Sequence, residues 1–163
     1  MSQVTIFDKE FELICQDLTE MGQLIDKSIA QCVKALTEGE AKLAHKVMER
    51  DQRVNELRFK VEEACLALIA TQQPTAGDLR AVVAAMHVVV ELERIGDYAA
   101  GIGKTVVLMK EEPMLKTLKK LPRMGELSRE LLAEGMKAFF TRDGKLARQV
   151  AGRGAESRRC LSG

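Results

Sequence analysis

The stretch AMHVVVELERIGDYAAGIGKTVVLM, residues 85–109, carries the clearest structural signal in the sequence. Its apolar side chains recur at steps of three and four residues, which places them along one face of an α-helix. These positions are Ala85, Val88, Leu92, Ile95, Ala99, Ile102, Val106 and Met109. The period therefore predicts a long amphipathic helix, which begins after Pro74 and ends before Pro113.

Two similar apolar stripes precede this helix, over residues 7–36 and 43–68. The turn-forming segment 37–40 separates them, and Pro74 ends the second stripe. Helices of about 30 residues are about 45 Å long, and short connections between them make neighbours antiparallel. The sequence therefore predicts an all-α fold in which residues 1–112 form an antiparallel three-helix bundle.

The composition excludes several classes of protein. Aromatic residues make up 4% of the chain and tryptophan is absent, which argues against a β-sandwich or barrel. The 25 Lys and Arg residues balance 24 Asp and Glu residues, so no basic field attracts nucleic acid. The longest apolar run, residues 81–90, is far shorter than the roughly 20 residues of a membrane span. No secretory leader opens the sequence and the cysteines form no CxxC pair, so we expect a cytoplasmic protein.

An internal repeat extends the pattern beyond the bundle. Met21-Gly22 aligns with Met124-Gly125, and about a third of the residues match over the following ~30 positions. We therefore expect residues 121–150 to form the first, long helix of an incomplete second repeat. The tail, residues 151–163, loses the apolar period and much of its helix propensity. It is predicted to be either a disordered end or the product of a shifted reading frame.

The predicted fourth helix carries an apolar side that further helices would cover in a complete second repeat. Its members are Leu127, Leu131, Leu132, Met136, Phe139, Phe140 and Leu146. A large exposed apolar face drives association. We expect this side to pair between two chains, which predicts a homodimer. The alternative is that the fourth helix folds back on the first bundle.

Two carboxylates are the first candidate for chemistry. Glu93 and Asp97 are four residues apart, so both lie on one face of the predicted helix. Like charges at this spacing repel each other mildly unless a cation lies between them. A metal ion is one such cation, since hard cations bind clustered carboxylate oxygens. An arginine is the alternative, and the candidates are Arg50, Arg53, Arg80 and Arg94.

A second polar stripe lies on the preceding helix and consists of Asp51, Asn55, Arg58 and Glu62. Antiparallel packing would bring Asp51 and Asn55 toward the part of the next helix that carries the two carboxylates. The sequence therefore predicts a metal site formed by Glu93, Asp97, Asp51 and Asn55. A polar stripe that simply faces solvent is the alternative.

The sequence offers no pattern typical of an enzyme. Neither His45 nor His87 belongs to a Glu-x-x-His pair, which a ferritin-like di-iron site requires on two helices. No phosphate-binding glycine loop and no nucleophile elbow are present in the sequence. We therefore expect a non-enzymatic protein whose long helical faces bind partners.

The segments TQQPTAGDLR, residues 71–80, and ELERIGDYA, residues 91–99, resemble the PhoU family of phosphate-transport accessory and regulatory proteins. The resemblance implies two tandem three-helix bundles and multinuclear metal clusters held by paired acidic motifs. It also implies negative regulation of phosphate-starvation signalling, through contact with a sensor histidine kinase and with the ATPase of the phosphate transporter.

The family's acidic motifs carry over only in part. Glu93 and Asp97 match the motif of the third helix, and Asp51 matches the first position of the motif on the second helix. Asn55 stands where the second acid is expected, which removes one negative charge. We therefore expect weak or no binding of Fe, Zn, Mn or Mg. The resemblance predicts a metal-binding regulator of phosphate uptake, and a metal-independent helical scaffold is the alternative.

Overall fold

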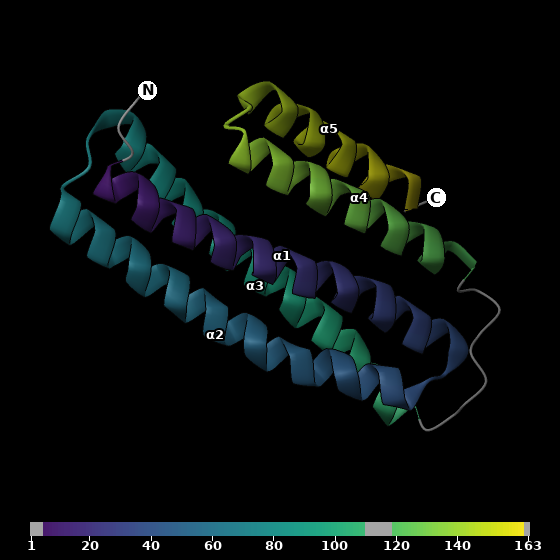
Figure 1. Ribbon diagram of the computed structural model, residues 1–163. Helices are drawn as coiled ribbons and strands as arrows, with labels where there is room; N and C mark the ends of the chain where they lie inside the picture. Colours follow the sequence, from purple (N-terminus) through teal and green to yellow (C-terminus); the bar gives the residue numbers. More distant parts are fainter. Residues whose placement is uncertain (1–4, 110–118, 162–163) are drawn as a thin grey trace.

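The computed structural model describes residues 5–109 and 119–161, with side chains described up to residue 155. Its five helices are α1 (Ile6–Glu38), α2 (Ala41–Gln72), α3 (Ala76–Leu108), α4 (Leu121–Phe140) and α5 (Gly144–Leu161). Figure 1 shows α1, α2 and α3 as a bundle of long antiparallel helices, with α4 and α5 as a shorter hairpin beside it. The predicted all-α fold with a three-helix bundle is confirmed.

The boundaries of the first helix follow from local chemistry. The Thr5 hydroxyl accepts a hydrogen bond from the Asp8 N–H at 3.1 Å, and the Asp8 carboxylate accepts one from the Thr5 N–H at 2.8 Å. This reciprocal pair is a capping box, which satisfies two backbone donors that the helix leaves free. At the other end Gly39 adopts a left-handed conformation with a φ of 71°, which ends α1.

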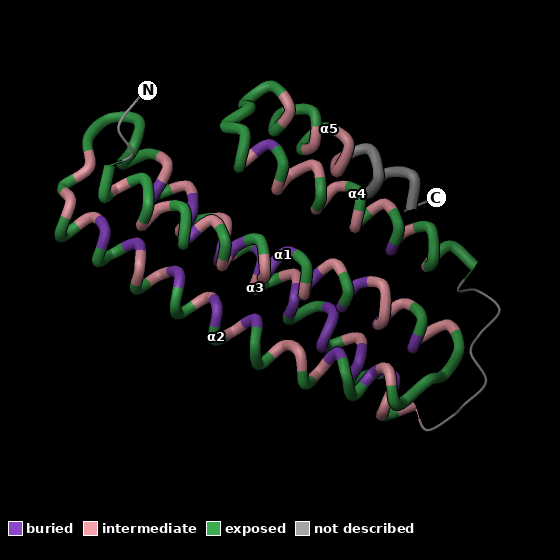
Figure 2. The backbone as a smooth tube through the Cα atoms, in the orientation of Figure 1, coloured by how far each residue is buried: buried purple, intermediate pink, exposed green. Residues whose placement is uncertain are grey.

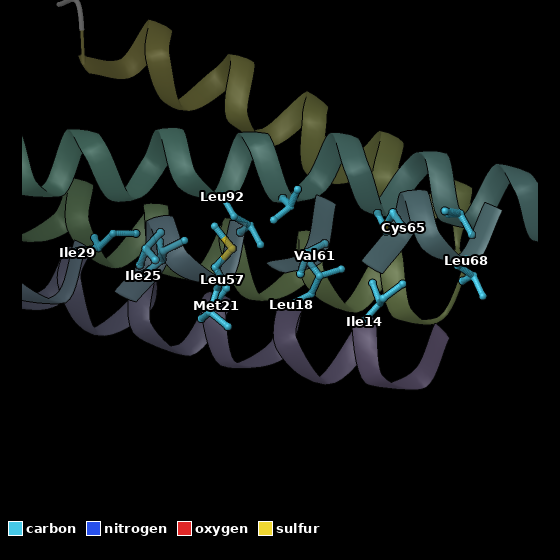
Figure 3. Packing of buried hydrophobic residues seen from close by; sticks show 14 residues of the cluster. Ile14, Leu18, Met21, Ile25, Ile29, Leu57, Val61, Cys65, Leu68 and Leu92 are labelled. Carbon is cyan, nitrogen blue, oxygen red and sulfur yellow. The ribbon is translucent and has the colours of Figure 1, made fainter. Parts of the chain in front are cut away.

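The core of the molecule lies between α1, α2 and α3, and Figure 3 shows part of it. Its largest fully buried side chains include Ile14, Leu18, Met21, Ile25, Leu57 and Leu68. Figure 2 shows that the buried segments follow the inward faces of these three helices. On α3 the buried stripe also includes Gly96 and Gly103. A Cβ on Gly103 would lie 3.1 Å from the Ala44 carbonyl oxygen, so this glycine permits close approach of α2.

The prediction of one helix over residues 121–150 is wrong. Helix α4 ends at Phe140, and Arg142 adopts a left-handed conformation with a φ of 52°. The Asp143 carboxylate then accepts hydrogen bonds from the N–H groups of Lys145 and Leu146, at 2.9 and 3.0 Å. This capping starts α5, because it satisfies donors at the first turn of the new helix.

A disordered tail is also not what the structure shows, since α5 continues to Leu161. Gly152 and Gly154 weaken the intrinsic helix propensity there. Arg153 offsets this effect, because its guanidinium donates to Glu134 and Glu130 on the neighbouring α4. The shifted reading frame stays a prediction.

Helix α4 packs against α1 through two contacts that the internal repeat relates to each other. Gly22 on α1 lies against Met136, and Gly125 on α4 lies against Val33. In the repeat, Gly22 corresponds to Gly125 and Val33 corresponds to Met136, so the two contacts are equivalent. Near the centre, the Arg129 guanidinium binds both oxygens of its repeat equivalent, Asp26, at 2.8 and 2.9 Å.

This packing is the alternative to pairing between chains, in which the fourth helix folds back on the first bundle. Leu132, Met136 and Phe139 pack against the core cluster of the first bundle. The structure thus covers part of that side within one chain, and Gly22 of α1 makes room for Met136 of α4.

Candidate metal site between α2 and α3

The four predicted ligands lie along the seam between α2 and α3, with Asp51 and Asn55 on α2 and Glu93 and Asp97 on α3. Gly96 is what lets the helices meet there. A Cβ at Gly96 would lie 3.3 Å from the Asp51 Oδ1 atom and 3.2 Å from Val54. A Cβ at this position would require the Asp51 and Val54 side chains to shift by a few tenths of an ångström.

Asp51 carries the buried, unpartnered polar atom of the seam. Its Oδ1 atom is buried and has no hydrogen-bond partner among the described residues. Burial raises the pKa of Asp51, and the charges of Asp97 and Glu93 raise it further. The charge of Lys104 and the neighbouring amide of Asn55 lower this pKa in part. A buried carboxylate oxygen without a hydrogen-bond donor costs free energy, and a raised pKa reduces this cost by favouring the protonated form.

Glu93 already has a cationic partner. The Arg58 Nη1 atom lies 3.1 Å from the Glu93 Oε1 atom, and the Arg58 Nε atom lies 3.2 Å from the Glu62 Oε1 atom. The Glu93 side chain is 17% exposed and that of Arg58 is 30% exposed, so this ion pair is partly shielded from water. Arg58 therefore ties α2 to α3 and neutralises one of the two acids of the helix 3 motif.

None of the four arginines proposed from the sequence makes this contact. Arg94 pairs with Glu91 on its own helix, and Arg53 pairs with Glu20 on α1. Arg50 donates to Gln31 and Ser28, which also lie on α1. No described ion pair links Arg80 to Glu93. Sequence reasoning placed Arg58 on the polar stripe, but it did not pair Arg58 with Glu93.

The residue types at the seam suit a hard cation, but within the described residues their arrangement does not form a metal site. Two carboxylates, a shielded third one and an amide carbonyl are the oxygen ligands that hard cations prefer. Asp97 is exposed, however, and no group of three or more His, Cys, Asp or Glu side chains within residues 5–109 and 119–155 is arranged to hold a metal.

An apolar groove of about 560 Å³ lies away from this seam, between α3 and α4. Its lining residues include Val88, Leu92, Ile95, Leu131 and Met136. A second groove of about 630 Å³ shares Val88 and Gly135 with it and continues toward Phe140 and α5. The two grooves form one apolar strip along the line where the first bundle meets the α4–α5 hairpin.

None of the helices that the structure describes is both long enough and apolar enough to cross a membrane. The fold defines an all-α protein in which a three-helix bundle, with an acidic seam between α2 and α3, is followed by a helical hairpin whose first helix repeats the pattern of α1. Comparison with known proteins identifies the family.

The sequence profile of the PhoU domain matches residues 18–106, which covers most of the three-helix bundle. A phosphate-specific transport system accessory protein PhoU homolog of Aquifex aeolicus is 32% identical over 142 residues, 87% of this chain and 64% of that protein. The corresponding protein of Caulobacter vibrioides is 33% identical over 141 residues, 86% of this chain and 61% of that protein. The chain therefore belongs to the PhoU family.

Solved structures agree with this assignment. The crystal structure of PhoU from Pseudomonas aeruginosa matches with a TM-score of 0.86 and 29% identity, over 94% of this chain and 74% of that chain. The phosphate transport system regulatory protein PhoU from Streptococcus pneumoniae matches with a TM-score of 0.82 and 30% identity, over 92% and 70% of the two chains. This chain spans about three fifths of the curated relatives' length.

Proposed function

We propose that the chain is a non-enzymatic accessory regulator of phosphate uptake that lowers phosphate-starvation signalling in the cytoplasm. The PhoU domain over residues 18–106 carries this proposal, because the relatives that share it are named as accessory proteins of phosphate-specific transport. The test is a phosphate-starvation reporter in a bacterium that lacks its own PhoU. Expression of this chain is expected to repress the reporter in high phosphate, and a full-length relative is the positive control. A reporter that stays fully induced, with soluble chain present, contradicts the proposal.

We propose that regulation acts through contact with the transporter ATPase and with a sensor histidine kinase. The long helices offer broad faces, and the apolar strip between α3 and α4 is a surface on which a partner helix could lie. Pull-down with each purified partner tests this contact. A charged residue in the strip, Leu131→Glu, is expected to weaken binding, whereas Gln52→Glu on the exposed side of α2 is the matched control. Equal binding by both variants would exclude the strip.

Metal binding is the second part of the proposal. Asp51, Asn55, Glu93 and Asp97 would together hold one Fe, Zn, Mn or Mg ion weakly. When bound, the ion would neutralise the acidic charge between α2 and α3. Asp97→Asn is expected to weaken binding by about tenfold or more, a loss comparable to that caused by removing outer-shell partners of metal ligands. Glu91→Gln is the control, because Glu91 lies on the same helix but pairs with Arg94.

A metal-independent helical scaffold is the second candidate, and the Arg58–Glu93 ion pair favours it. An internal cation already supplies part of the charge that a metal would bring. The two candidates differ in one measurement, which is partner binding before and after dialysis against a chelator. Loss of binding on metal removal supports the metal-dependent regulator, and unchanged binding supports the scaffold.

We also propose that the chain forms a homodimer. Phe140 remains 39% exposed, and Leu79 and Val83 on α3 are similarly exposed. Such apolar surface favours self-association, although α1 covers part of the α4 face. Light scattering after gel filtration at micromolar concentration measures the mass. A species of 18.1 kDa at every concentration would contradict the dimer.

A further inference from the structure

Helices α2 and α3 carry large apolar side chains on a face that α4 and α5 do not cover. Phe59 and Leu66 on α2 are 61% and 58% exposed, and Leu79 and Val83 on α3 are 38% and 41% exposed. Helix α4 contacts α1, and Figure 1 shows α2 on the opposite side of α1 from the α4–α5 hairpin. Apolar side chains that gather on an exposed face mark a surface for binding.

These side chains belong to two stripes in which steps of three and four residues alternate. The stripe on α2 contains Phe59, Glu62 and Leu66. The stripe on α3 contains Leu79, Val83, Met86, Val90, Glu93 and Asp97. We call the two stripes together the heptad face, because this spacing is the one by which a helix packs along another helix.

Arg58 shows that the two stripes lie side by side. Its guanidinium donates to Glu62 of the α2 stripe at 3.2 Å and to Glu93 of the α3 stripe at 3.1 Å. The heptad face is also distinct from the apolar strip between α3 and α4. That strip is lined by Val88 and Ile95, which the helical period places on another side of α3.

The two ends of the heptad face differ in chemistry. One end is apolar and contains Leu66, Leu79 and Val83, whereas the other end carries Glu93 and Asp97. Arg58 already pairs with Glu93. Asp97 is exposed, and none of the ion pairs within the described residues includes it. Asp97 is therefore the acid that a cation from outside can reach.

We propose that the heptad face binds an amphipathic helix of a partner protein, which places apolar residues over one end and an Arg or Lys against Asp97 at the other. Anchors at steps of three and four residues are how such helices bind grooves. From Leu79 to Asp97 the face spans about 27 Å, which matches a partner helix of about five turns. This contact is separate from the one proposed for the strip between α3 and α4.

Charge favours such a partner over a second copy of this chain. If two heptad faces pair in parallel along their full length, the acidic ends meet and repel each other. If they pair antiparallel, the acidic end of each copy lies against the apolar end of the other, which costs desolvation without a partner for the charge. A basic amphipathic helix avoids both arrangements.

The probe is a synthetic helical peptide with Leu at the heptad positions of two heptads and Arg at those of a third. Its binding to the full chain is measured by fluorescence anisotropy. Leu66→Glu is expected to weaken binding by about tenfold or more, because it places a charge in the apolar end. Ala67→Glu is the matched control, since it adds the same charge at the next exposed position of α2, outside the stripe. Equal binding by the two variants overturns the inference.

A second comparison tests the acidic end. Asp97→Asn is expected to weaken binding by about two- to fivefold and to reduce its salt dependence, as for an exposed ion pair. Glu91→Gln is the control, because Glu91 lines the strip on the other side of α3. A peptide with Glu in place of Arg should bind more weakly and should lose nothing further from Asp97→Asn. If Asp97→Asn weakens both peptides equally, the contact with Asp97 is overturned.

A third measurement uses the unmodified chain. The ε-methyl resonance of Met86 reports on the heptad face, and that of Met136 reports on the strip between α3 and α4. The peptide is expected to shift the Met86 resonance and to leave that of Met136 in place.

Three results of these measurements would overturn the inference. The first is no binding of the peptide at concentrations up to about a millimolar. The second is a shift of Met136 alone, which would place the peptide in the strip and leave the proposed function standing. The third is a dimer that Leu66→Glu converts to a monomer, which would make the heptad face an interface between copies of this chain.

Discussion

The first repeat and the start of the second carry the same apolar pattern, but they bury it to different extents. Met21 is fully buried, whereas its repeat equivalent Met124 is only half-buried. Val47 is 1% exposed and its equivalent Val150 is again half-buried. In α1–α3 each helix contacts the other two, whereas α4 lies between α1 and α5. Within the described residues, the first repeat buries its apolar side chains more completely because α3 covers both α1 and α2.

Ionic contacts partly take the place of apolar burial in the second repeat. Arg129 holds α4 to Asp26 on α1, and Arg153 holds α5 to Glu134 and Glu130 on α4. Ion pairs that are half-exposed contribute little free energy, typically about 0–1 kcal/mol each. The first repeat should therefore be much more stable than the attachment of the second, and the following measurements test that difference.

Truncating a core leucine should have the largest effect. Leu57 in α2 is fully buried, so Leu57→Ala is expected to lower the free energy of unfolding by about 2–5 kcal/mol. Leu132 in α4 is only partly buried, and Leu132→Ala should cost about 1 kcal/mol. Urea denaturation followed by circular dichroism measures both values. Equal losses would mean that the two repeats are packed equally well.

Two glycines of α3 give a sharper test of helix packing in the first repeat. Gly103→Ala places a Cβ 3.1 Å from the Ala44 carbonyl oxygen. This oxygen belongs to the backbone of α2, so it cannot move away as a flexible side chain would. We expect a loss of about 1–3 kcal/mol from this overpacking. Gly101→Ala is the matched control, because no atom lies within 4 Å and the gain in helix propensity is about 0.8–1 kcal/mol. The prediction fails if both substitutions change the thermal midpoint in the same direction.

Alkaline pH should destabilise the first repeat through two buried thiols. Burial raises the pKa of Cys32 and of Cys65 from 9.0 to about 11. The unfolded chain releases these protons at lower pH than the folded chain does. Their stabilising contribution is thus complete below pH 9 and is lost as the pH rises toward about 11.

Thermal midpoints measured across this pH range check the effect, with the Cys32→Ala/Cys65→Ala variant as the reference for all other titrating groups. We expect a steeper fall for the unmodified chain than for the variant. Parallel curves would show that the thiols do not contribute to the pH dependence.

The smallest effect is expected at the junction between the repeats. Asp26 and Arg129 are about 40% exposed, so Asp26→Asn should cost about 0.2–1 kcal/mol. A double-mutant cycle with Arg129→Gln isolates the pair, and high salt should reduce its coupling energy. A coupling energy well above this range would show that the ion pair is central to holding α4 against α1.

The internal repeat contains a signal for the turn between α4 and α5, which the sequence analysis did not predict. Gly39 ends α1 in a left-handed conformation, and its equivalent is Arg142, which adopts the same conformation after α4. The equivalent of Ala41, where α2 begins, is Gly144, where α5 begins. Aligning the helix boundaries along with the side chains would have predicted the break. The missing glycine hid it, because arginine seldom marks a left-handed position.

The candidate site was also predictable only in part. The spacing of Glu93 and Asp97 predicts one acidic face, and antiparallel packing predicts its approach to Asp51. The part played by Arg58 did not follow from the sequence. Five arginines lie on α2 and α3, and which of them reaches Glu93 depends on how far each helix is rotated about its axis.

The sequence by itself determined the helices, the three-helix bundle and the family, because periodicity, turn residues and the ELERIGDYA segment are local properties of the chain. Only the tertiary structure decided that α4 packs on α1, that Gly96 makes room for Asp51, and that Arg58 neutralises Glu93. These outcomes depend on distances of a few ångströms between residues far apart in the chain. Such distances are set by the packing of whole helices and not by the pattern of any one of them.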